Sequence, residues 1–90
     1  MSLRDIRTIA VQKMEGEVEK LEKELIKLKK THSEKQQQLF DLAKEGKSEE
    51  VLLKLEIIQK EINELVVSIR STDSRISKIK NRAKRLKRNG

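Results

Sequence analysis

The residues of this chain with the clearest chemical potential are the lysines and arginines near its end. From Ser74 to Gly90 there are eight basic residues and no acidic ones, whereas the rest of the chain has 14 basic and 15 acidic residues. The net charge of +7 therefore belongs to one segment. Cations gathered in this way suit the phosphates of nucleic acid, an acidic protein surface or an anionic lipid surface.

If the chain folds back on itself, this segment lies beside the basic residues of the N-terminus, and we predict a single basic tip for an acidic partner. The same run also suits a purely structural interpretation, as a solvated helix end that complements the helix dipole. Phe40 is the one aromatic residue and lies far from the run, so any nucleic acid would be bound through phosphates, without sequence preference. The predicted basic tip comprises Arg4, Arg7, Arg75, Lys78, Lys80, Arg82, Lys84, Arg85, Lys87 and Arg88.

No spacing of residues in the chain predicts catalysis, a metal site or a bound cofactor. His32 is the only histidine and cysteine is absent, which excludes paired-histidine metal motifs and thiolate chemistry. The sequence has neither an apolar run of ~18–20 residues that could cross a bilayer nor a signal-peptide core. We therefore expect a non-enzymatic intracellular protein, in the cytoplasm.

The elements that must position the basic residues are two long helices with heptad seams. Apolar residues recur at alternating steps of three and four from Val11 to Leu42 and again from Leu55 to Leu86. Between the two seams, Gly46 can end one helix and Ser48 can cap the next. The pattern predicts one domain, 1–90, with helices at about 3–44 and 49–87 and a turn at about 45–48. The fold class is all-α: an antiparallel two-helix coiled-coil hairpin.

The two seams can be paired by folding the chain about Gly46. Leu28 then faces Leu65 and Val18 faces Ile76, and the seam phase continues unbroken through 71–74, which predicts a continuous second helix. On the flanks, we expect Glu17 near Arg75 and Glu15 near Lys80. His32 and Lys35 fall at seam positions, where a polar residue can set register or act as a pH-sensitive weak point.

Several apolar residues lie off the seam and need another surface to cover them. The simplest cover is a second copy, so that two hairpins form a four-helix assembly; scattered exposed aliphatic residues are the alternative. The predicted oligomer face comprises Leu53, Ile57, Val66 and Val67.

Part of the chain resembles the small helical-hairpin phosphatases of the sporulation relay in bacilli. The second helix of that family has Ser-Gln-Glu-Leu-Asp, where this chain has Gln59-Lys60-Glu61-Ile62-Asn63. The serine and the aspartate are both missing, and the match covers about a third of the chain. We do not assign the chain to that family.

The sequence therefore predicts a coiled-coil interaction and assembly module with a basic tip for an acidic partner. Its expected partners are a second copy of itself and an unidentified protein. The alternative is a nucleic-acid-binding accessory protein in which the basic tip is the whole function. A membrane-surface role fits less well, because Ile76, Ile79, Ala83 and Leu86 are already used by the seam.

Overall fold

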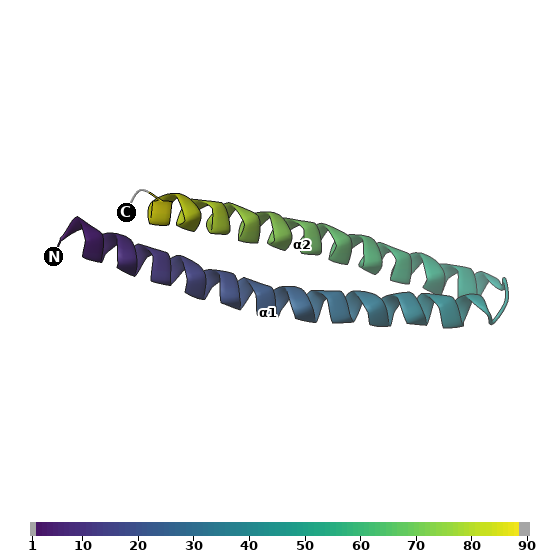
Figure 1. The fold of residues 1–90 in the computed structure, drawn as a ribbon. Helices are drawn as coiled ribbons and strands as arrows, with labels where there is room; N and C mark the ends of the chain where they lie inside the picture. Colours follow the sequence, from purple (N-terminus) through teal and green to yellow (C-terminus); the bar gives the residue numbers. More distant parts are fainter. Residues whose placement is uncertain (1, 89–90) are drawn as a thin grey trace. The chain divides into compact units, whose positions relative to one another are not determined.

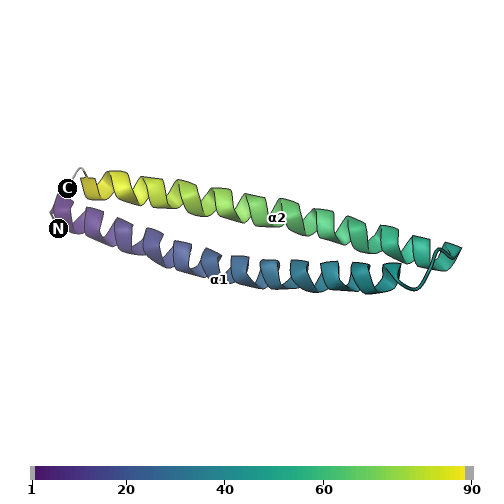
Figure 2. The ribbon, with the colours of Figure 1, turned by 45° about the vertical axis from the view of Figure 1, so that its right-hand side comes forward.

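Two long helices make up almost all of residues 2–88, the part of the chain that the computed structural model describes. Helix α1 spans Leu3–Ala43 and helix α2 spans Glu49–Arg88. The chain is an all-α helical hairpin, as predicted, and α2 continues through residues 71–74 without a break (Figures 1 and 2). The predicted bounds, about 3–44 and about 49–87, lie within one residue of these.

Local hydrogen bonds explain where each helix begins. The Ser2 hydroxyl accepts a bond from the Asp5 amide at 3.2 Å, and the Asp5 carboxylate accepts one from the Ser2 amide at 3.4 Å. This reciprocal capping box satisfies amides that have no partner within the first turn of α1. At the start of α2, the Ser48 hydroxyl accepts a bond from the Val51 amide at 3.2 Å. The Ser48 cap was predicted from the sequence.

The turn between the helices depends on Gly46. The last turn of α1 tightens as the Glu45 amide donates to the Leu42 carbonyl at 3.0 Å, and Gly46 then takes a φ of 114°. Residues with a Cβ avoid this half of conformational space, and Gly46 is the one described residue with a positive φ. The reversal of the chain thus rests on one glycine.

Replacing the two interior glycines by alanine should change stability in opposite directions. Gly46→Ala forces a Cβ into a strained φ and should lower the free energy of unfolding by about 1 kcal/mol or more. Gly16 lies within α1, and a Cβ built there meets nothing within 4 Å, so Gly16→Ala should raise stability by roughly 0.5–1 kcal/mol. Urea titration followed by circular dichroism measures both. Equal shifts for the two variants would contradict the role given to Gly46.

The contacts divide the hairpin into two units. The first unit pairs the beginning of α1 with the end of α2, residues 2–25 and 71–88 of the described chain. Its core is a cluster of Val18, Leu21, Ile76 and Ile79, against which Met14 and Leu25 pack. Val11 and Ala83 are buried in the same unit. All of these residues occupy predicted seam positions, so the seam of this unit is confirmed.

The second unit comprises residues 26–70 and holds the turn. Its seam is less well buried, because Ile62 is its one buried apolar residue in the described chain, while Leu28, Ile58 and Leu65 are half-buried. Lys35 lies at a seam position, and its Nζ reaches out to Glu61 Oε2 at 2.5 Å. The Lys35 stem is thus partly covered while its ammonium is paired at the edge of the seam.

Candidate functional site

The structure brings the two ends of the predicted basic tip together in the first unit. Arg4 and Arg7 belong to the first turns of α1, and Figures 1 and 2 both show this purple segment beside the yellow end of α2. Arg4, Arg7, Leu86 and Lys87 line one surface hollow. The first unit carries 13 basic and 7 acidic residues, against 9 and 8 in the second. Nearly all of the net positive charge therefore lies in the first unit.

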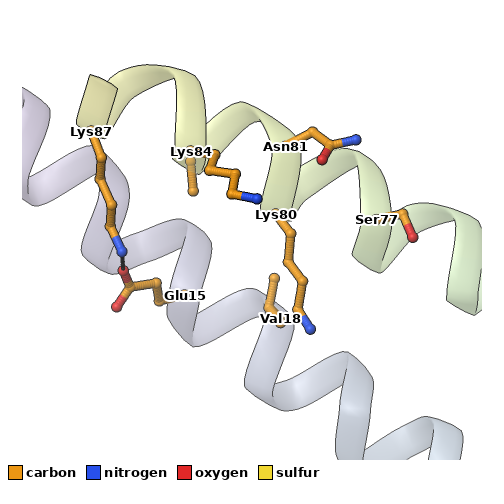
Figure 3. Close-up of a pocket in the computed structure, with 8 residues that line it drawn as sticks. Glu15, Val18, Ser77, Lys80, Asn81, Lys84 and Lys87 are labelled. Carbon is orange, nitrogen blue, oxygen red and sulfur yellow. Dashed lines mark ion pairs between the residues drawn. The ribbon is translucent and has the colours of Figure 1, made fainter. Parts of the chain in front are cut away.

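Two lysines of the basic tip are held by glutamates of α1. Lys87 Nζ lies 2.7 Å from Glu15 Oε1 (Figure 3), and Lys80 Nζ lies 3.4 Å from Glu22 Oε1. The lysines are seven residues apart on α2, and the glutamates are seven residues apart on α1. The same flanking contact thus repeats after one heptad, as antiparallel coiled coils require. The expected approach of Lys80 to Glu15 as an ion pair is corrected, because Lys80 pairs with Glu22.

The opposite flank of the first unit has one ion pair. Arg75 Nη2 lies 3.5 Å from Glu17 Oε1, which confirms the predicted proximity of these residues. The equivalent positions one heptad away are Arg82, seven residues after Arg75 on α2, and Ala10, seven residues before Glu17 on α1. Alanine offers no carboxylate, so the repeat of ion pairs stops here and Arg82 is left without a partner of this kind.

The remaining cations of the basic tip are exposed and mostly unpaired. Arg7 is the exception, since it is half-buried and is engaged within the structure. From Ser74 onward α2 has no acidic residue that could pair with its cations along the helix. Among residues 2–88, the tip cations that form no ion pair are Arg4, Lys78, Arg82, Lys84, Arg85 and Arg88.

The cations of α2 lie along two different faces. Lys80, Lys84 and Lys87 line an open groove of about 640 Å³ in the first unit, together with Val18 and Ala83 (Figure 3). Two of these three lysines are neutralised by the glutamates described above. Lys78, Arg82 and Arg85 follow one another at steps of four and three, which places them along a second face. We call these three residues the cation row.

The predicted oligomer face lies on α2 in the second unit, and its four residues differ in exposure. Leu53, Ile57 and Val67 are 57%, 59% and 67% exposed, whereas Val66 is half-buried. Val66 directly follows the seam residue Leu65, so it lies on the flank of the seam and not on the outer face. Leu53, Ile57 and Val67 instead share their face with Lys60 and Glu64, at steps of four and three throughout. We call these five residues the outer row; its two charged members, Lys60 and Glu64, were not part of the predicted oligomer face, although their heptad spacing is visible in the sequence.

Within residues 2–88, no group of three or more His, Cys, Asp or Glu side chains could hold a metal ion. Neither helix, over its described length, has a stretch apolar enough to span a bilayer. Comparisons with protein-family models, with curated proteins and with solved structures found no match to this chain.

Proposed function

We propose that this protein is a non-enzymatic coiled-coil interaction module whose basic tip binds an acidic partner. The hairpin holds the beginning of α1 and the end of α2 side by side, so cations from both helices act together. In this proposal the outer row contacts a second copy, so that two hairpins assemble.

The observation that carries the proposal is the set of unpaired cations in the first unit. Six of the ten cations of the basic tip form no ion pair within residues 2–88, while the nearby Glu15, Glu17 and Glu22 are already taken by other cations. A helix dipole is complemented by cations within its last turn, and three lie there: Arg85, Lys87 and Arg88. Lys78 and Arg82 lie further back, where dipole complementation does not explain them.

Retention on immobilised heparin, a polyanion, tests the proposal. The wild-type protein should elute at high salt, and a variant with five tip cations changed to Gln should elute much earlier. A control variant with five exposed cations of the second unit changed to Gln has the same net charge and should elute close to wild type. The tip variant changes Arg82, Lys84, Arg85, Lys87 and Arg88; the control changes Lys27, Lys29, Lys30, Lys47 and Arg70.

Equal elution of the two variants would overturn the proposal, because retention would then follow net charge and not a localised site. Circular dichroism of both variants serves as the folding control. The substituted side chains are exposed in each case, so helix content should be unchanged.

A further inference from the structure

We propose that the acidic partner of the basic tip is the phosphate backbone of double-stranded nucleic acid, bound by the cation row of Lys78, Arg82 and Arg85. This inference rests on the proposed function and assigns it a ligand class. The sequence alone also placed nucleic acid first among the ligands of the basic tip, while it favoured as principal partner a protein docked on the apolar flank.

The first argument is the chemical composition of the face. Stable protein interfaces depend on apolar or aromatic side chains buried at their centre, with charges at the rim. Within residues 71–88 of α2 no large apolar side chain is exposed; those of the first unit are Leu3, Ile6 and Ile9, on α1. The α2 face that carries the cation row is built from cations and small polar residues and has no apolar anchor of its own for a protein partner. Phosphate binding needs only the cations.

The second argument is the freedom of the three side chains. Lys78 and Arg85 have no acidic residue three or four positions away on α2, and Arg82 faces the heptad position of Ala10 where a glutamate would be needed. All three are exposed. A ligand phosphate therefore replaces only water around these cations and breaks no ion pair. By contrast, phosphate binding by Lys80 or Lys87 would compete with Glu22 or Glu15.

The third argument is the length and rigidity of the row. From Lys78 to Arg85 the helix rises by about 10 Å at ~1.5 Å per residue. Duplex DNA carries a phosphate for about every 1.7 Å of its axis, counting both strands, so several phosphates lie within reach of the row at once. Since the row lies on one continuous helix, its cations are held in line before binding. The one aromatic residue, Phe40, belongs to the second unit, so the first unit has no aromatic side chain to stack on an unpaired base, which favours a duplex over a single strand.

The test compares a fluorescein-labelled DNA duplex with a labelled polyglutamate peptide as ligands of the full chain, by fluorescence anisotropy. Three phosphate contacts predict a log–log salt slope of about −2.7 for the duplex, or a loss of affinity of roughly 40-fold between about 50 and 200 mM salt. Two duplexes of unrelated sequence should bind alike. The triple variant K78Q/R82Q/R85Q should bind the duplex more weakly by on the order of 100-fold at about 0.15 M salt.

The control variant is K27Q/K29Q/K30Q, which has the same net charge and changes exposed lysines of the second unit. It should retain most duplex affinity. If polyglutamate binds the basic tip as tightly as the duplex, or if the triple variant and the control lose equal duplex affinity, the inference is overturned. If the duplex experiment fails but retention on heparin still depends on the tip cations, the proposed function stands and only the ligand class is wrong. If retention on heparin does not depend on the tip cations either, both the proposed function and this inference are wrong.

Discussion

Ile79→Asp should unfold the hairpin at room temperature, whereas Ile26→Asp should leave it folded. Ile79 is 9% exposed and belongs to the cluster with Val18, Leu21 and Ile76. Ile26 is 68% exposed on α1. The two variants make the same chemical change to the same residue type, within helices of similar length, so burial is the main difference between them.

The size of the effect follows from the thinness of the core. Cutting a buried isoleucine back to alanine costs about 2–5 kcal/mol, and placing a carboxylate in the same position adds its desolvation. At roughly 0.05–0.15 kcal/mol per residue, a domain of 90 residues has about 5–13 kcal/mol of stability, and a thin two-helix seam should lie toward the low end of that range. The exposed substitution should cost only about 0.5 kcal/mol, mainly through helix propensity.

Far-UV circular dichroism with thermal melting separates the two variants. The Ile79→Asp protein should lose its cooperative transition, and Ile26→Asp should melt within a few degrees of wild type. Ile79→Ala is a milder change, so this variant should keep a cooperative thermal transition, with a melting temperature below that of wild type. If Ile79→Asp melts like wild type, then the cluster in the first unit is not what holds the two helices together.

The seam could be predicted from sequence because heptad spacing requires only the phase of apolar residues. Val18, Leu21, Ile76 and Ile79 are buried where that phase places them. The turn was equally predictable, since Gly46 is the one glycine between the two seams and its φ is positive. In both cases the information is local, and no long-range geometry is needed to extract it.

The partners of the flanking charges were harder to predict, because lysine and glutamate side chains are long. Lys80 was expected beside Glu15 and instead pairs with Glu22, while Lys87 pairs with Glu15. Several pairings of this kind fit one hairpin, and only the relative shift of the two helices selects among them. The cation row could not be recognised as unpaired for the same reason. Its three cations are unpaired because the nearby glutamates of α1 form ion pairs with Arg75, Lys80 and Lys87, and the sequence does not show which pairs form.

Val66 has a degree of burial that its sequence position did not indicate. Its apolar character and off-seam position suggested an outward-facing residue, yet it is half-buried. A residue next to a seam position is partly covered by the neighbouring helix, and the sequence alone does not show how far that cover extends. The outer row therefore differs from the predicted oligomer face in leaving out Val66 and including Lys60 and Glu64, which gives it regular heptad spacing.

The outer row leads to the second large effect, which is that Ile57→Glu/Val67→Glu should convert a self-associated protein into a monomer. Leu53, Ile57 and Val67 are exposed along one face with heptad spacing, the pattern by which helices pair. When two copies of the row are placed antiparallel about a two-fold axis near Ile62, Ile57 of one copy meets Val67 of the other. Lys60 then meets Glu64 of the second copy, and the same contact is repeated on the other side of the axis.

This self-complementary order of charges is why we expect a second copy of the chain on the outer row, and it permits a charge-swap experiment. Lys60→Glu alone sets two glutamates against each other at both symmetric positions and should weaken the dimer. Adding Glu64→Lys restores opposite charges and should recover it. The matched control, Ile26→Glu/Phe40→Glu, places two glutamates on exposed apolar positions of α1 and should not affect association.

Sedimentation equilibrium at tens of micromolar protein measures these outcomes. Wild type, the charge-swapped variant and the α1 control should sediment as dimers, while Ile57→Glu/Val67→Glu should sediment as a monomer and Lys60→Glu should show a raised dissociation constant. Exposed ion pairs contribute only about 0.2–1 kcal/mol each, so two restored pairs correspond to a recovery of roughly 2- to 30-fold in affinity. A monomeric wild type, or a charge-swapped protein no tighter than Lys60→Glu, would show that the outer row does not pair with itself in this arrangement.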